Sequence, residues 1–321
     1  MHASRTALES LFRAELEQPA LPAAAALADA IRARHGDAVL ALLFYGSCLR
    51  RGTPEGVLDF YVVVASYRGA YRSRLPALAA GLLPPNVHYV ELVPQNLRAK
   101  YALISLVDFE RSVAPASLDC RVWARFCQPA RIVWARDEAT RAALVAAAAH
   151  AAVTMTERML AFAPEDSVER TLELRALWTR GFRETYRAEL RSESPETIAE
   201  LYGADARRYD RVAREAVRAL AAEGRLRVAG ESEGALTIVE PPRELASARR
   251  AWRWRRPVAK ALAIAGLLKT AFTFDGWLPY VVWKLERQSG ASIELSERQR
   301  RRPLLFAWPV ILRLLRDGVL R

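Results

Sequence analysis

The sequence predicts an α+β protein, and three observations support this prediction. Two apolar segments typical of strands, Val39–Tyr45 and Leu58–Val64, lie in the first third of the chain and are joined by a short Arg/Gly/Pro loop. An alanine-rich run, Ala143–Leu160, is typical of a long helix that ends before Pro164. Further on, two strand-like arms enclose Glu231–Gly234, as in a hairpin. Strands followed by mainly helical segments indicate segregated α and β elements.

The remaining elements follow from local patterns. Asn86–Val93 alternates apolar and polar residues after a Pro-Pro break, and Tyr101–Ser105 is a second short strand. Helices are expected at Leu21–His35, Tyr71–Leu83 and Val168–Leu190.

The segment 195–240 predicts a helix, a second helix and then the hairpin, which is the order of a winged-helix arrangement. Winged helices often bind DNA, but this hairpin carries Glu231 and Glu233 at its turn. Because acidic side chains repel phosphates, nucleic acid is not expected as a partner of this wing.

The length of the chain suggests two domains or one domain with an extension, and its cysteines favour a reducing compartment. The chain has 321 residues, of which 52% are hydrophobic, enough for a substantial core. We predict a first domain at 1–140, a helical, winged-helix-like domain at 141–245 and a basic, Trp-rich tail at 246–321. Three cysteines show neither metal-ligand spacing nor a disulfide framework. No basic region followed by an apolar core marks a secretory signal at the N-terminus.

The positive charge is concentrated in the tail. Residues 249–321 contain 16 Lys and Arg against 5 Asp and Glu, so nearly all of the net charge of +12 lies there. Five of the eight tryptophans lie in the same stretch. Tryptophan mixed with basic residues suits an anionic lipid surface. The alternative is a basic tail that packs on its own protein or binds nucleic acid.

No tail segment reaches the roughly 20 apolar residues of a spanning helix. An interfacial helix that lies on the bilayer is the expected form of the C-terminal end. The residues predicted to contact the membrane are Trp252, Trp254, Arg255, Arg256, Trp308 and Arg313.

The candidate site lies where the two N-terminal strands meet. Gly46 and Ser47 follow the first strand, and Asp59 stands near the start of the second. A glycine lets the backbone approach a triphosphate, a serine offers a hydroxyl and an amide, and a carboxylate can hold magnesium. This pattern is similar to the nucleotidyltransferase fold of polymerase-beta-like enzymes. The alternative is an ordinary tight turn and a capping Asp. That fold usually has a second carboxylate two residues on, where this chain has Tyr61.

Three further residues complete the candidate set. Lys100 is the only lysine in the first 259 residues of an arginine-rich chain. Its presence suggests that this position needs a compact ammonium group. The alternative is a surface lysine that has been retained by chance. Glu91 could supply the missing metal carboxylate, or could be an exposed edge-strand residue. Arg125 could be a second cation for phosphates, or could form a salt bridge near Asp108 or Glu110.

Taken together, these segments resemble the mitochondrial-type phosphatidate cytidylyltransferases, the translocator assembly and maintenance family, in a bacterial branch. The matching segments are Tyr45–Ser47, Leu58–Phe60, Pro85–Tyr89, Lys100–Ser105 and Trp123–Ile132. In the last segment only Arg125 and Pro129 match, and Cys127 and Gln128 stand where the family has His and Lys.

The resemblance implies a magnesium-dependent cytidylyltransferase. CTP and phosphatidic acid would give CDP-diacylglycerol and pyrophosphate, for phospholipid biosynthesis. Asp59 and Lys100 would be catalytic, and Asp59 and Glu91 would hold Mg²⁺. The nucleotide would bind to Tyr45, Gly46, Ser47, Lys100 and Arg125.

The implied location is cytoplasmic, peripheral on the inner face of the bacterial cell membrane. Two alternatives stay open at this point. One is a nucleotidyltransferase with another acceptor, such as a sugar phosphate, RNA or a protein. The other is a non-catalytic lipid-binding pseudoenzyme.

Overall fold

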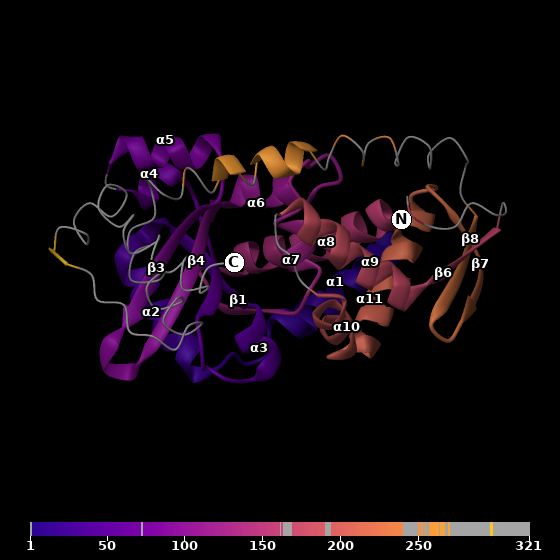
Figure 1. The fold of residues 1–321 in the computed structure, drawn as a ribbon, viewed down its shortest axis with the longest axis horizontal. Coiled ribbons are helices and arrows are strands. Elements are labelled where there is room, and N and C mark those ends of the chain that lie inside the picture. Colours follow the sequence, from indigo (N-terminus) through magenta and orange to yellow (C-terminus); the bar gives the residue numbers. More distant parts are fainter. Residues whose placement is uncertain are drawn as a thin grey trace.

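The computed structural model describes residues 2–71, 73–160, 162, 169–189, 194–239, 250, 252, 254, 257–262, 264–266, 269, 296 and 297. A five-stranded sheet with flanking helices forms one end of the molecule, and a helical part with a three-stranded sheet forms the other (Figure 1). The predicted α+β class is therefore confirmed.

The larger sheet is mixed. Its strand order is β3-β4-β2-β1-β5, in which β2 and β4 run parallel and the other neighbours antiparallel. The strands are β1 Val39–Tyr45, β2 Leu58–Val64, β3 Asn86–Leu92, β4 Leu97–Ser105 and β5 Ala130–Ala135. The first two have the predicted bounds. β4 begins four residues earlier than predicted, because its first half pairs with β3 in a hairpin.

Helices cover both faces of this sheet. In chain order the helical elements are α1 His2–Leu16, α2 Pro22–His35, η1 Gly36–Ala38, α3 Ser47–Arg51, α4 Tyr67–Ala70, α5 Arg74–Leu82, η2 Val93–Gln95, α6 Leu106–Val113, α7 Trp123–Phe126 and α8 Glu138–Leu160. Side chains alternate along a strand, so Phe44 and Phe60 pack with α2 on one face. Leu43 and Tyr61 point to the other face, into the core shared with α1 and α8.

The C-terminal half corrects one predicted element. The helix expected over 168–190 is a strand, β6 Glu169–Glu173, followed by α9 Leu174–Ala188. The strand forms because Leu172 pairs with Leu236 of β8 and both side chains are buried. The other elements are α10 Pro195–Gly203, α11 Ala206–Ala222, β7 Arg227–Ser232 and β8 Ala235–Val239.

The three strands of the second sheet have the order β6-β8-β7 and are antiparallel. The two predicted helices and the hairpin are present, and the winged-helix assignment stays a prediction. One continuous core runs from α1 through α8 to α11 and β8. The predicted domain limit at 140/141 falls within α8, and the limit at 245/246 lies outside the described residues.

The described part of the tail packs on the rest of the protein. Trp252 is 5% exposed and its ring meets that of Phe162 edge-on at 5.7 Å between centroids. Its predicted membrane contact is therefore wrong for this structure, because the indole is used in the protein's own core. Trp254 is 75% exposed, as a membrane contact requires. The predicted contacts Arg255, Arg256, Trp308 and Arg313 lie outside the described residues.

Within the described ranges, no helix combines the length and the apolar content needed to cross a bilayer.

Candidate functional site

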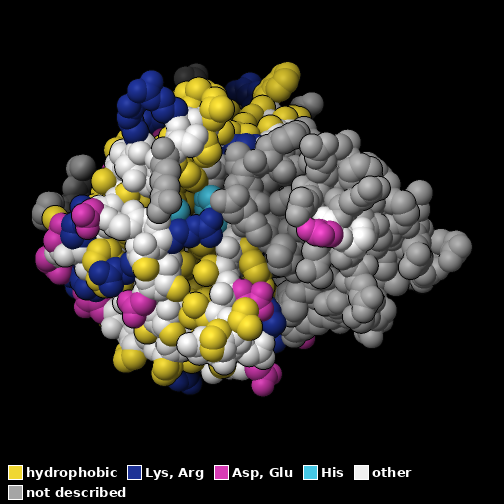
Figure 2. Space-filling view, turned by 90° about the vertical axis from the view of Figure 1, so that its left-hand side faces the viewer, with side chains coloured by type: hydrophobic (Ala, Val, Ile, Leu, Met, Phe, Trp, Pro, Cys, Tyr) yellow, Lys and Arg dark blue, Asp and Glu magenta, His cyan; other side chains and the backbone are white. Residues whose placement is uncertain are grey.

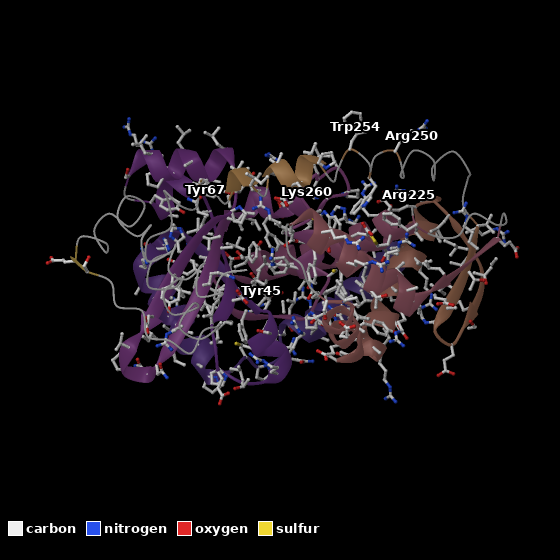
Figure 3. All side chains as sticks on the ribbon, viewed as in Figure 1. Tyr45, Tyr67, Arg225, Arg250, Trp254 and Lys260 are labelled. Carbon is white, nitrogen blue, oxygen red and sulfur yellow. The ribbon has the colours of Figure 1, made fainter. Side chains whose placement is uncertain are left out.

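Three of the predicted residues lie side by side at one end of the larger sheet. Tyr45, the last residue of β1, pairs with Asp59 of β2, and Asp59 pairs with Lys100 of β4. Residues paired in register point to the same face of a sheet. The three side chains therefore form a row on the face that also carries Tyr61, and Figure 3 labels Tyr45 near the middle of the view.

Gly46 allows the chain to turn tightly over Asp59. Its φ is +91° and its ψ is −161°, a conformation that is essentially restricted to glycine. A Cβ at this position would lie 2.8 Å from Oδ2 of Asp59, closer than ordinary contact. Ser47, the next residue, is exposed and begins α3. The turn thus places the Gly46 backbone against the Asp59 carboxylate, and an exposed serine follows it in the chain.

Asp59 and Lys100 form an ion pair across β2 and β4. The Lys100 Nζ atom lies 3.0 Å from Oδ1 of Asp59, and the two side chains are 35% and 23% exposed, respectively. Both charges can therefore still reach a ligand from solvent. The sequence predicted each residue as catalytic, and the structure brings the two together.

Arg125 lies near this row but is held by another partner. Its Nη2 donates to Glu189 at 3.2 Å, and its Nη1 donates to the Arg121 carbonyl at 3.1 Å. The suggested salt bridge to Asp108 or Glu110 is wrong, because the carboxylate that pairs with Arg125 is that of Glu189.

Burial by itself would lower the pKa of the Arg125 guanidinium, but the neighbouring Glu189 carboxylate outweighs it, and the pKa is raised. Burial also raises the pKa of the Tyr45 hydroxyl, which keeps it protonated at neutral pH. Next to Asp59 the row therefore carries a neutral Tyr45 hydroxyl, and the charge of the nearby Arg125 is compensated by Glu189. Sequence reasoning missed Glu189, because a carboxylate at the end of an amphipathic helix gives no signal of its distant partner.

Glu91 is not brought to Asp59. Its carboxylate pairs with Arg98 at 2.9 Å, opposite it on the β3–β4 hairpin. The strand β4 separates β3 from β2, and Glu91 is offset from Asp59 by two residues along the strands, so their backbones lie about 12 Å apart.

Tyr61, at the position of the missing carboxylate, is 1% exposed and packs against the rings of Phe109 and Phe126. Across the part of the chain that the structure describes, no three His, Cys, Asp or Glu side chains gather as metal ligands would.

The residues therefore do not fit a site in which two carboxylates hold metal ions. They fit a single magnesium ion that arrives with a triphosphate, because Mg²⁺ can be held by one protein carboxylate together with substrate phosphates. Asp59 would be that carboxylate.

A second feature, which sequence reasoning missed, is a small cavity of about 170 Å³ between α1, the start of β5 and α11. It is lined by both signs of charge, including Arg131, Arg208 and Glu15. Arg208 is 5% exposed and donates to both oxygens of Glu15 and to the Cys127 carbonyl. Arg208 thus links α11 to α1 through its ion pair with Glu15, which indicates a structural role.

Comparisons with known proteins give little support to any particular family. No protein-family model matches the chain, and no curated protein matches it. Among solved structures, the chain has some similarity to a nucleotidyltransferase-like protein from Exiguobacterium sibiricum 255-15, with 9% identity and a TM-score of 0.28. That match covers 68% of this chain and 99% of the other. A superposition this weak does not establish a shared fold, so the function must be argued from the site.

Proposed function

We propose that the protein is a nucleotidyltransferase whose site is the row at the end of β1, β2 and β4. The observation that carries this proposal is the convergence of a glycine turn, an exposed serine, a carboxylate and a lysine at one sheet end. A backbone without Cβ, a hydroxyl and an ammonium are groups that bind phosphate oxygens.

The Asp59–Lys100 ion pair gives the unliganded site a neutral resting state. A triphosphate would compete with Asp59 for the Lys100 ammonium, because a more highly charged anion attracts it more strongly. Asp59 would then be available for the magnesium ion, which neutralises charge on the phosphates. Lys100 in its new position would stabilise the charge that develops on the leaving pyrophosphate.

Within this class we propose CTP as donor and phosphatidic acid as acceptor, on the strength of the resemblance carried by Tyr45–Ser47 and Lys100–Ser105. An oxygen of the lipid phosphate forms a bond to the α-phosphorus of CTP. The bond from that phosphorus to the bridging oxygen of the β-phosphate breaks, and pyrophosphate leaves with the electron pair. The attacking oxygen is already an anion, so the site needs positioning and charge neutralisation more than a general base.

A second candidate is a nucleotide- or lipid-binding protein without catalytic activity. It is favoured by Tyr61 in the core and by Glu91 in an ion pair with Arg98, since these leave one carboxylate in the row.

The test is incubation of the purified protein with CTP labelled at the α-phosphate, magnesium and liposomes that contain phosphatidic acid. We expect label in the lipid phase, and we expect Asp59→Ala to abolish it. Glu91→Gln is the matched control, because it removes a carboxylate of the same sheet that lies away from the row, and it should retain activity.

Three other results would be informative. Pyrophosphate release that does not require phosphatidic acid would retain the nucleotidyltransferase and exclude the lipid acceptor. CTP binding without pyrophosphate release would support the non-catalytic candidate. Activity that survives Asp59→Ala would place the site elsewhere.

A further inference from the structure

Helix α5 presents an unusual row of leucines to solvent. Leu75, Leu78 and Leu82 are 77%, 62% and 76% exposed, whereas Ala80 on the opposite side is buried. At 100° per residue the three leucines fall within about 60° of one another around the helix axis. We call them the α5 leucine row. Large exposed apolar groups that are contiguous mark an interaction site more often than scattered ones do.

Positive charge precedes the α5 leucine row in the chain. Between Asp59 and Glu91 the sequence contains three arginines and no acidic residue. Two of these arginines, Arg68 and Arg74, are exposed on α4 and at the start of α5. Figure 2 shows hydrophobic side chains projecting at the top of the molecule with Lys and Arg side chains beside them.

The basic tail reaches the same side of the protein. The Lys269 ammonium donates to the carbonyl oxygens of Leu83 and Pro85, directly after α5. Earlier in this segment, Trp254 and Arg250 project from the side of the molecule on which α5 lies (Figure 3). From residue 245 to residue 274 the sequence has seven basic residues and no acidic one. Two acid-free stretches far apart in the sequence thus meet at α5.

We propose that the α5 leucine row, with Arg68 and Arg74, is a docking surface for an anionic lipid bilayer. Leucines on one helix face beside cations are the composition of helices that lie in a membrane interface. The positive charge favours an anionic surface, because each Lys or Arg close to such a surface is attracted by it. A second copy of the chain is disfavoured as the occupant, because it would bring the same uncompensated charges to the interface.

Docking through α5 would fix the orientation of the candidate site. α4 contacts η1, which precedes β1, so α4 and α5 lie where β1 begins, whereas Gly46 follows its end (Figure 1). A strand of seven residues separates the two ends by about 20 Å. A docked protein would therefore present the end of the sheet that carries Asp59 at a defined distance from the α5 leucine row.

The test is co-sedimentation of the full chain with vesicles of phosphatidylcholine containing 30% phosphatidylglycerol, without CTP. Membrane binding is thus measured independently of the proposed nucleotidyl transfer. We expect the triple variant Leu75→Gln/Leu78→Gln/Leu82→Gln to lower the partition coefficient at least tenfold. Arg68→Gln/Arg74→Gln should lower it on these vesicles and leave any binding to pure phosphatidylcholine unchanged.

Val93→Gln is the matched control. Val93 is 74% exposed, like the α5 leucines, but lies in η2, directly after β3. It is therefore at the end of the sheet where the candidate site lies. It should bind vesicles like the unaltered protein. Binding that is lost in Val93→Gln and kept in the α5 triple variant would overturn the proposal.

Two further measurements distinguish a lipid bilayer from other occupants of the α5 leucine row. A dimer in analytical ultracentrifugation that the triple variant abolishes, without vesicle binding by the unaltered protein, would identify a second copy and overturn the proposal. A thermal midpoint lowered by several degrees in the triple variant would show that the leucines are covered by the chain itself, which would also overturn it.

Discussion

Replacement of Gly46 by alanine tests the geometry on which the candidate site depends. The backbone conformation at Gly46 costs a residue with a Cβ about 1–3 kcal/mol. The new Cβ would also lie 2.8 Å from Oδ2 and 3.3 Å from Cβ of Asp59. The carboxylate must therefore move, which disturbs its ion pair with Lys100. We expect Gly46→Ala to lower the free energy of unfolding by about 2–4 kcal/mol, strain and displaced contact together.

Urea denaturation of the variants measures this, with Gly52→Ala as the matched control. Gly52 also has a positive φ, +65°, but nothing lies within 4 Å of its added Cβ, so only strain of about 1 kcal/mol is expected. In the background of Asp59→Ala, the cost of Gly46→Ala should fall by about 1 kcal/mol, because the nearest oxygen is gone. Equal losses of unfolding free energy in Gly46→Ala and Gly52→Ala would show that the added Cβ does not displace the Asp59 carboxylate. An unchanged loss for Gly46→Ala in the Asp59→Ala background would show the same.

Three further predictions depend on the burial of individual side chains. Arg125→Met should destabilise the protein by about 3 kcal/mol, because Glu189 is left buried and unpaired, and Arg125→Met/Glu189→Met should recover most of the loss in the same denaturation assay. An equally unstable double variant would contradict this. Burial lowers the pKa of His88 to about 3, so the unfolded chain binds its proton first on acidification. The contribution of neutral His88 to the free energy of unfolding is complete above about pH 6.5 and is lost as the pH falls towards 3. The free energy of unfolding should therefore decrease by about 2 kcal/mol between pH 7 and pH 5. The pH dependence of urea unfolding should flatten in His88→Phe, and an unchanged slope would show that other groups cause it. Trp252→Ala should cost about 3 kcal/mol in thermal or urea unfolding and Trp254→Ala less than about 0.5 kcal/mol, since the first is buried and the second exposed. Equal effects would mean that the described packing of the tail is wrong.

The sequence predicted the central row of the site because the relevant signals are local. A glycine and a serine after a strand, and a carboxylate at the start of the next strand, can be recognised within fifteen residues. Lys100 was identified from its rarity and from the resemblance of its segment. Its contact with Asp59 depends on the parallel pairing of β2 with β4, which no local pattern indicates.

The predictions that failed are those that needed a partner distant in sequence. Glu91 was expected at a metal, but the hairpin register places it opposite Arg98. Trp252 was expected at a membrane, but the ring of Phe162 provides a buried neighbour. In both cases residue type alone permits either role, and the available partner decides between them.

Local sequence patterns are sufficient to predict the strands Val39–Tyr45 and Leu58–Val64, the turn at Gly46, the concentration of positive charge in the tail and the α+β class. Periodicity, glycine and charge act over short distances along the chain, so their consequences can be read from neighbouring residues. The ion pairs of Asp59 with Lys100 and of Arg125 with Glu189 could be seen only in the folded protein. The same holds for the exposure of the α5 leucines beside the basic tail. Those outcomes depend on strand order, register and helix packing, where segments far apart in sequence compete for the same partners.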